Sequence, residues 1–282
     1  MDYDLIVVKT LERVYKNYYY IIRGDKEMAI EAVIFDWAGT TVDYGCFAPV
    51  QAFIEAFKEF GITPTEEEVR KPMGMLKHDH IETMMNMERI HNEWIRIHGK
   101  DFTAEDVDKV YEASEAGIFK ILKDFAEPKP FVLETIEKLR QAGIKIGSTT
   151  GYTDDMMAIV VPKAAENGYT PDCWFSPNSV ENLGRPYPYM IFKNMEKLKV
   201  TSVKNVVKVG DTVSDIKEGL AAGVTTVGVI EGSSIMGLSK ETYEALAPEE
   251  QEKECRRVAQ VYKETGADHI IRNMSELTTI LL

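Results

Sequence analysis

The stretch Glu31-Ala-Val-Ile-Phe-Asp-Trp-Ala-Gly-Thr-Thr-Val-Asp43 decides how this chain folds. Its apolar run Ala32–Phe35 has no polar residue within it, which is typical of a strand buried on both faces of a parallel sheet. Asp36 follows directly, at the carboxyl end of that strand, where open α/β sheets bind their ligands. The stretch therefore predicts both a central strand and the place of a site, although an aspartate that only caps the next turn explains Asp36 equally well when it is considered alone.

Further apolar runs predict more strands of the same sheet. They are Ile144–Ser148, Val203–Val209, Thr225–Ile230 and Asp268–Ile271. Helical patterns separate them, several of which end at glycine; these are Phe131–Ala142, Thr153–Asn167, Pro186–Leu198 and Val213–Ala222. Strands that alternate with helices predict an α/β fold, with a Rossmann-like parallel sheet as the core and helices on both of its faces.

One long segment breaks this alternation. From about Phe47 to Phe125 the patterns are helical only, and they include Pro49–Phe60, a capping box at Thr65–Glu68 and Thr103–Lys123. We expect an all-helical cap domain at residues 47–125, inserted into a catalytic core made of residues 28–46 and 126–282. Residues 1–27 are expected to be an N-terminal extension outside both parts.

The composition argues against several classes of function. The chain has 282 residues, 44% of them hydrophobic, and a formal net charge of −13 at pH 7. This charge argues against binding to nucleic acid or to an anionic membrane, and no apolar run reaches the roughly 18 residues of a membrane span. Three widely separated cysteines, Cys46, Cys173 and Cys255, match no metal-ligand spacing and favour a reducing cytoplasm over a disulfide framework.

Polar residues suited to a phosphoryl group stand at two further positions. Thr150 and Gly151 follow the second predicted strand, where a hydroxyl and an N–H at a helix start can hold phosphoryl oxygens. Arg185 precedes a predicted helix and suits a phosphate clamp. Considered alone, Thr150 is also consistent with an ordinary helix cap and Arg185 with a surface arginine.

The third predicted strand ends in Val209-Gly-Asp-Thr-Val-Ser-Asp215, which contains two carboxylates. Together with Asp36, Asp211 and Asp215 predict a site of hard oxygen ligands, the kind that magnesium prefers. The ordered set of Asp36, Thr150, Arg185 and this acidic pair resembles the haloacid dehalogenase superfamily, from about residue 31 to the C-terminus. The resemblance implies that Asp36 attacks the substrate and forms a covalent intermediate, which water then hydrolyses.

Position 38 separates the branches of this superfamily. Most of its phosphatases have a second aspartate there, which protonates the leaving group and activates water, whereas this chain has Ala38. The dehalogenase branch also lacks this aspartate, but it attacks carbon and needs no metal, and Asp211 and Asp215 are retained here. The combination favours a magnesium-bound phosphorus centre with a carbon leaving group. Carbon leaves with its electrons only when they are delocalised, for example into an iminium that a lysine forms with an aldehyde.

Three segments resemble the phosphonoacetaldehyde hydrolase family of this superfamily: Asp36–Cys46, Arg70–His80 and Gly147–Thr153. The resemblance implies that the substrate is a small phosphonate, phosphonoacetaldehyde, whose carbon–phosphorus bond is cleaved to acetaldehyde and phosphate. It implies that Lys77 forms a Schiff base with the aldehyde while Asp36 takes the phosphoryl group. It also implies that His80 shuttles protons, that Cys46 and Tyr152 line the site, and that the enzyme is a homodimer.

The sequence around Lys77 is compatible with this role. If Lys77 lies on a helix, Met73 and His80 share its face. Desolvation by Met73, with the cations Arg70 and Lys71 nearby, would lower the pKa of Lys77 toward that of a nucleophilic amine. A solvated surface lysine is the alternative for any lysine considered without this context.

Magnesium is expected to be held by Asp36, the backbone carbonyl of Ala38 and Asp211, with Asp215 in support. A carbonyl ligand from position 38 does not depend on the missing side chain. Because Lys77 and Asp36 are predicted on different domains, the cap must close for reaction, and we expect hinges at Tyr44–Ala48 and Phe125–Pro130.

Two other functions remain open from the sequence. The first is a phosphatase or phosphomutase of the same superfamily acting on a small phosphate ester, for which the acid at position 38 is missing. The second is a degenerate member that only binds its ligand, which the loss of Asp36 or Asp211 would favour. For the homodimer, Trp94, Met84, Met85 and Met87 could supply apolar contact from the cap, or they could belong to its core.

Overall fold

Five parallel strands form the sheet that the apolar runs predict, in a computed structural model that describes residues 30–282. The predicted N-terminal extension therefore lies outside the described residues. The strands are β1 Ala32–Phe35, β2 Lys145–Ser148, β3 Val206–Gly210, β4 Thr225–Val229 and β5 His269–Ile271, in the order β2-β1-β3-β4-β5. Phe35 of β1 is in register with Ser148 of β2 and Val209 of β3. The residues that follow these three strands therefore meet at one edge of the sheet.

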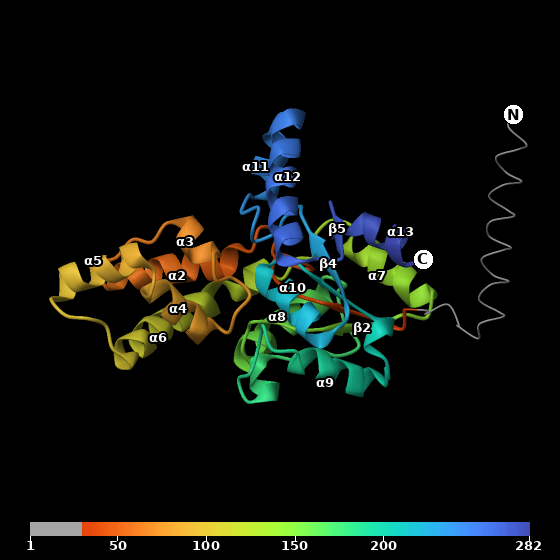
Figure 1. Ribbon diagram of the computed structural model, residues 1–282, viewed down its shortest axis with the longest axis horizontal. Helices are drawn as coiled ribbons and strands as arrows, with labels where there is room; N and C mark the ends of the chain where they lie inside the picture. The colour runs from red at the N-terminus through yellow and green to blue at the C-terminus, as the bar shows by residue number, and fades with distance from the viewer. Residues whose placement is uncertain (1–29) are drawn as a thin grey trace, which may run out of the picture.

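Alternate side chains of β1 face opposite sides of the sheet, as the strand period of two requires. Val33 and Phe35 pack in one cluster with α7 (Val132–Gln141), α8 (Asp154–Glu166) and α13 (Leu277–Leu281). Ala32 and Ile34 pack on the other face with α9 (Tyr189–Leu198) and the end of α10 (Val213–Ala222). These helices flank the sheet in Figure 1. The fold class is thus as predicted, a parallel sheet covered on both faces.

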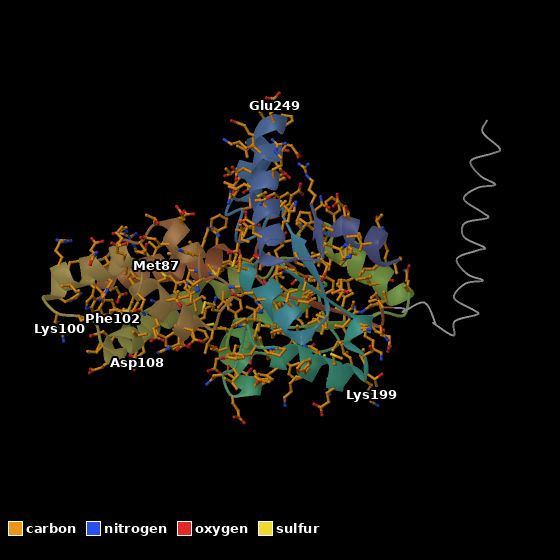
Figure 2. The ribbon with its side chains drawn as sticks, in the orientation of Figure 1. Met87, Lys100, Phe102, Asp108, Lys199 and Glu249 are labelled. Atoms are coloured by element: carbon orange, nitrogen blue, oxygen red, sulfur yellow. The ribbon has the colours of Figure 1, made fainter. Side chains whose placement is uncertain are left out.

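Two further helices lie outside these layers. They are α11 (Lys240–Ala245) and α12 (Pro248–Thr265), and Figure 2 shows Glu249 at the far end of α12, away from the sheet. Cys255, Val258 and Tyr262 are the buried residues of α12. No helix within residues 30–282 is long and apolar enough to cross a membrane.

Between β1 and β2, the segment from Phe47 to Phe125 is helical, as predicted, and its helices form a group beside the sheet at the left of Figure 1. It contains α2 (Phe47–Glu59), α3 (Glu66–Arg70), α4 (Lys77–Met85), α5 (Glu88–His98) and α6 (Ala104–Ile121), followed by a 3₁₀ turn at Leu122–Phe125. The predicted capping box is present, since Thr65 and Glu68 bond each other's backbone N–H. These helices have an apolar cluster of their own. That cluster supports the division into a cap (47–125) and a core (28–46, 126–282), which stays a prediction.

Three of the residues considered for dimer contact lie in that apolar cluster. Trp94 is 2% exposed, Met84 0% and Met85 1%, so they pack inside the cap and are not available to a partner. Met87 is half-buried and lies on the cap (Figure 2). Of the two alternatives left open by the sequence, the core of the cap is therefore the right one for these three, because helical spacing does not distinguish an inner face from an outer one.

Most element boundaries differ from the prediction by one or two residues, and two differ by three. The helix expected from Pro186 begins at Tyr189, because Tyr187 precedes Pro188 and a residue before proline disfavours helical backbone angles. The strand expected from Val203 begins at Val206, since Val203–Asn205 forms a 3₁₀ turn that the Ser202 side chain caps. Apolar content alone did not reveal either turn.

The two connections between core and cap run side by side. Val42 and Pro128 form an antiparallel bridge, and the Lys129 N–H donates to the Thr41 carbonyl at 2.9 Å. The expected first hinge, Tyr44–Ala48, is shortened because α2 already begins at Phe47. Gly45 and Cys46 precede that helix with positive φ angles of 88° and 53°. The bend between the two parts is therefore concentrated just before α2.

Candidate active site

Asp36 lies directly after β1, in a loop that its neighbours hold tightly. Its N–H donates to the Val209 carbonyl of β3 at 2.9 Å, and its own carbonyl accepts from the Thr41 hydroxyl at 2.9 Å. Gly39 has φ +87°, and a Cβ atom there would lie 2.2 Å from an Asp211 carboxylate oxygen. Only glycine allows the loop to pass so close to the third strand end.

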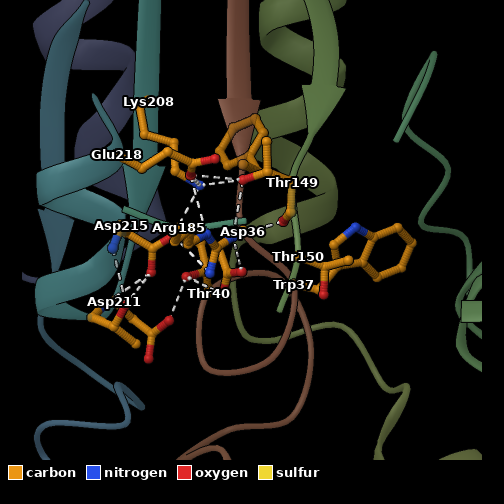
Figure 3. Close-up of polar contacts among 12 residues, drawn as sticks. Asp36, Trp37, Thr40, Thr149, Thr150, Arg185, Lys208, Asp211, Asp215 and Glu218 are labelled. Carbon is orange, nitrogen blue, oxygen red and sulfur yellow. Dashed lines mark hydrogen bonds and ion pairs between the residues drawn. The ribbon is translucent and has the colours of Figure 1, made fainter. Parts of the chain in front are cut away.

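Arg185 reaches the Asp36 side chain from the loop before α9 (Figure 3). Its Nη2 lies 2.5 Å from Asp36 Oδ1 and its Nη1 lies 3.1 Å from Asp215 Oδ1, while the arginine side chain is only 1% exposed. Although burial acts to lower the pKa of Arg185, the carboxylates of Asp215 and Asp36 raise it further above its usual range. The guanidinium is therefore a permanent positive charge beside Asp36, not the surface arginine that the sequence left open.

Asp211 and Asp215 follow β3 and converge on Asp36, as predicted. One oxygen of each of the three buried carboxylates lies within 4.8 Å of the others. Burial raises the pKa of Asp211 well above its usual range, and repulsion from Asp36 and Asp215 adds to the effect. For Asp215, burial acts in the same direction, but the charges of Arg185 and Lys208 outweigh it and lower the pKa.

The Asp211 carboxylate accepts hydrogen bonds only from neutral groups among the described residues. These are the Thr40 hydroxyl at 2.8 Å and the Ser234 N–H at 2.7 Å. A buried carboxylate that is repelled by two others and has no ion pair is stabilised by a cation. The donor set is all oxygen, so it fits a hard divalent ion.

The end of β2 brings Thr150, Gly151 and Tyr152 to the same edge of the sheet. The Thr150 hydroxyl accepts from the Tyr152 N–H at 3.0 Å, and all three residues are buried. A Cβ atom on Gly151 would lie 2.8 Å from the Met75 carbonyl, which belongs to the cap loop between α3 and α4. Gly151 thus allows the backbones of cap and core to approach closely at this edge, in addition to being a candidate N–H donor.

Lys77 is the first residue of α4 and points into an apolar surrounding. It is 4% exposed, and its Nζ lies 5.2 Å from the centre of the Tyr152 ring and 5.6 Å from that of Phe53. Within residues 30–282 no hydrogen bond or ion pair engages this Nζ. Burial lowers the pKa of Lys77, Arg185 lowers it further, and Cys46 and Asp36 oppose the shift only in part.

Burial is the largest cause of this pKa shift, as predicted, but the contributing cation is not one of those expected. Arg70 donates to the Gly45 carbonyl at 2.6 Å, Lys71 is exposed, and neither is a main contributor at Lys77. Met73 also does not share a helix face with Lys77, because it precedes α4, but the turn in between returns it to the same cavity. The cation that lowers the pKa of Lys77 is Arg185 of the core, which spacing along the cap could not indicate.

His80 lies one turn after Lys77 but faces the interior of the cap. Its Nε2 lies 2.8 Å from the Val69 carbonyl, and its ring packs 4.3 Å from that of Phe53. A carbonyl can only accept, so Nε2 carries the proton and Nδ1, which has no partner among the described residues, is unprotonated. Burial lowers the pKa of His80 well below its usual range. His80 is therefore a neutral imidazole behind Phe53 and is not among the residues that line the cavity.

One small cavity collects most of the predicted site residues. Its lining is Asp36, Ala38, Cys46, Met73, Gly74, Lys77, Thr150, Gly151, Tyr152, Arg185 and Thr212. It therefore combines residues of the core with residues of the cap loop and α4. Its volume is about 20 Å³, which is room for about one water molecule.

Comparison with known proteins bears on this arrangement. A family model described as haloacid dehalogenase-like hydrolase matches residues 30–223. A phosphonoacetaldehyde hydrolase from Lysinibacillus sphaericus is 53% identical over 254 residues, which are 90% of this chain and 94% of that protein. The chain belongs to the phosphonoacetaldehyde hydrolase family.

Two other members extend the comparison within this family. A bifunctional phosphonoacetaldehyde hydrolase/aminoethylphosphonate transaminase from Clostridioides difficile is 52% identical over 93% of this chain, which corresponds to 40% of that longer protein. A crystal structure of a phosphonoacetaldehyde hydrolase-like protein from Oleispira antarctica superimposes with a TM-score of 0.87 at 39% identity, covering 89% of this chain and 91% of that one. The chain is thus a haloacid dehalogenase-type hydrolase, and the family together with the acidic cluster implies a divalent metal.

Several residues around the site of this family member were not among the predicted ones. They are Thr40 and Thr149, which bond Asp211 and Arg185, and the charged residues Lys129, Lys208 and Glu218. Lys129 donates to the carbonyls of Gly39 and Glu231, and burial lowers its pKa to about 8. A signal existed for Lys208, since a lysine inside the run Val206-Val-Lys-Val209 has to find partners when the strand is buried.

Proposed function

We propose that this chain hydrolyses the carbon–phosphorus bond of phosphonoacetaldehyde, producing acetaldehyde and phosphate. One observation carries the proposal. The unpaired amine of Lys77, from the cap, and the carboxylate of Asp36, from the core, line the same small cavity, and Ala38 stands there in place of a phosphatase acid. An amine, a nucleophile and no acid for an oxygen leaving group are what carbon–phosphorus cleavage through an imine requires.

Lys77 acts first in this proposal. Its neutral Nζ adds to the aldehyde carbon, and the adduct loses water to form an imine. The lowered pKa of Lys77 favours the neutral amine that this addition needs. Protonation of the imine nitrogen gives an iminium, which is an electron sink one carbon away from the carbon–phosphorus bond.

Asp36 then attacks phosphorus. A bond forms between its carboxylate oxygen and phosphorus while the carbon–phosphorus bond breaks, and the released electron pair moves into the iminium to give an enamine on Lys77. Protonation of the enamine at carbon and addition of water release acetaldehyde and restore the amine. A second water hydrolyses the aspartyl phosphate, which releases phosphate and restores Asp36.

The residues around Asp36 support binding of the phosphoryl group. Arg185 holds a permanent positive charge beside the nucleophile, and the Thr150 hydroxyl and Gly151 N–H lie at the same edge. Cys46, Met73 and Tyr152 enclose the carbon end of the substrate and exclude water from the imine. His80, to which the resemblance gives the proton shuttle, faces the interior of the cap and does not line the cavity, so we give it no step in the proposed reaction.

We further propose that the divalent ion is magnesium. Asp36, the Ala38 carbonyl and Asp211 would hold it, with Asp215 in support, because these oxygens are the hard ligands that magnesium prefers. When bound, it neutralises charge on the phosphoryl oxygens and so lowers the barrier to attack by an anion.

The cap has to move during each cycle. A cavity of about 20 Å³ holds about one water molecule and does not admit a phosphonate, so this arrangement corresponds to a closed form. Hollows of about 610 and 630 Å³ flank residues 124–130, the second connection, and leave space around it. We propose that the bend lies at residues 43–46 and 125–130, near the positions expected from the sequence.

We also propose that the enzyme works in the cytoplasm as a homodimer formed through the cap. The three cysteines are unpaired in the described residues, which fits a reducing compartment. The cap exposes Ile95 and Ile97 on α5, at 40% and 37%, in place of the buried residues first considered for contact. Sedimentation of the intact chain checks the dimer, and an Ile95→Glu variant should shift it toward the monomer.

A trapping assay tests the function directly. Phosphonoacetaldehyde is added with magnesium, acetaldehyde and phosphate are measured, and borohydride is then added during turnover. The expected result is release of both products in equal amounts and a reduced secondary amine on the peptide that contains Lys77. Hydrolysis of a small phosphate ester without any adduct would replace this proposal with the phosphatase or phosphomutase function.

A further inference from the structure

A lysine lies fully buried in the middle of β3. Lys208 is 0% exposed, and its Nζ lies 2.9 Å from Asp215 Oδ1, 3.3 Å from Glu218 Oε2 and 2.8 Å from the Thr149 hydroxyl (Figure 3). Burial of an ionised amine is unfavourable unless it is paired and hydrogen-bonded. The proposed reaction gives Lys208 no step, so its place in the strand requires another explanation.

Glu218 is the less expected partner in this group. It follows Asp215 by three residues on α10, so both side chains project from one face of the helix toward the sheet. A Cβ atom on the next residue, Gly219, would lie 2.4 Å from the Thr226 methyl group, so α10 packs closely on the strands. That packing leaves Glu218 0% exposed, within reach of Arg185 and Lys208.

The guanidinium of Arg185 is held along two edges (Figure 3). On one edge Nε lies 3.0 Å from Glu218 Oε2, and Nη2 donates to the Thr149 hydroxyl at 2.9 Å. On the other edge Nη1 and Nη2 face Asp215 and Asp36. A planar guanidinium that is fixed along one edge has its other edge aimed in a single direction.

We propose that Glu218 is a positioning residue for the phosphoryl group, acting through Arg185. Its carboxylate holds the Nε edge, so that the opposite edge stays directed at Asp36 when a phosphoryl group is bound there. Lys208 is the counter-ion of Glu218 and Asp215, and leaves the charge of Arg185 available to the ligand. Glu218 itself touches neither the nucleophile nor the cavity.

The proposal implies that the loss of Glu218 weakens the binding of phosphate but not the formation of the imine on Lys77. Without Glu218 the guanidinium turns about its Cδ–Nε bond, and its contact with phosphoryl oxygens weakens. Lys77 has no contact with Glu218, and Arg185, which lowers the pKa of Lys77, keeps its charge and its partner Asp36, so imine formation is expected to persist. The part of this inference that concerns turnover rests on the proposed function, whereas the part that concerns phosphate binding does not.

Calorimetric titration with inorganic phosphate, in the presence of magnesium, tests the proposal. Glu218→Ala removes the acceptor and should weaken phosphate binding by about 10-fold or more, the usual effect of a lost hydrogen bond to a charged group. Glu218→Gln keeps an uncharged acceptor and should weaken it by only about 3-fold. The KM for phosphonoacetaldehyde should rise by similar factors, while borohydride labelling of Lys77 at saturating substrate stays at the wild-type level.

Asp268→Asn is the matched control, because Asp268 accepts two hydrogen bonds from Thr226 of the neighbouring strand and has no contact with Arg185. It should leave phosphate affinity unchanged. If Glu218→Ala does not fold, Glu218→Gln decides the matter. Wild-type phosphate affinity in a folded Glu218 variant, or a loss of Lys77 labelling equal to the loss of affinity, overturns the proposal. A wild-type chain that binds phosphate but does not turn over phosphonoacetaldehyde contradicts the proposed function alone.

Discussion

The core side and the cap side of the cavity hold their reactive groups in different ways. On the core side, charged and hydroxyl groups are held in a network in which Arg185 lies 2.5 Å from Asp36 and 3.1 Å from Asp215. On the cap side, Lys77 lies near the ring of Phe53 and, across the cavity, that of Tyr152, and within residues 30–282 no hydrogen bond or ion pair holds its amine. The core fixes charges in advance of the ligand, whereas the cap keeps an amine free of partners. An amine that has to add to an aldehyde must be uncharged, and an ion pair with a carboxylate would keep it protonated.

Asp36→Asn should have the largest effect of any change on the core side. The amide keeps the shape of the side chain but cannot attack phosphorus, so phosphate release should fall by about 10⁴-fold or more. Single-turnover phosphate release measures it, and Asp172→Asn, at the opposite end of β2, is the control. Turnover near the wild-type rate would remove Asp36 from the role of nucleophile.

Lys77→Arg should have the next largest effect and addresses the cap side. The guanidinium retains the charge but cannot condense with an aldehyde, so turnover should fall by at least about 10³-fold, and no borohydride adduct should form. Lys71→Arg, at an exposed position of the same segment, should behave as wild type. An active Lys77→Arg variant would show that the apolar surrounding of this amine has another purpose.

Removal of the divalent ion should lower turnover by about 100-fold or more, because Asp36 and Asp211 would then face the phosphoryl group with less positive charge opposite them. Exhaustive chelation followed by a phosphate-release assay measures the loss, and added magnesium should restore activity. Labelling of Lys77 should persist in the chelated enzyme, which would separate the two sides of the cavity. Full activity without metal would contradict the assignment of the acidic cluster.

Gly151→Ala should have the smallest effect and probes the contact between the two sides. The added methyl group would lie 2.8 Å from the Met75 carbonyl, so the cap would close less completely. We expect a loss of about 10-fold in kcat/KM with little change in melting temperature. Gly117→Ala, where the new atom meets Ala52 at an ordinary 3.7 Å, is the control. Equal activity of both variants would show that closure tolerates this displacement.

Much of the core side could be predicted from sequence because it depends on local order. Each apolar run ends in its polar residue, and parallel strands bring those ends together, so Asp36, Thr150 and Asp211 could be grouped without coordinates. Side chains that meet from different elements were harder to foresee. Nothing in the cap sequence indicated that Arg185 would influence the pKa of Lys77, and helical spacing alone could not decide whether Met84 and Trp94 face inward. Glu218 was missed because a glutamate on a helix is usually solvated, and only the close packing beside Gly219 buries it.

In the closing motion that we propose, the paired connections of the cap would allow a swing about one axis only. Val42 and Pro128 form a bridge, and Lys129 is hydrogen-bonded to Thr41. Because the two connections are joined in this way, they would act as a single hinge. A substrate bound covalently to Lys77 would then move together with the cap. Its carbon–phosphorus bond would reach Asp36 when the cap closes and move away from it when the cap opens. Cleavage would therefore be confined to the closed form, from which water is excluded.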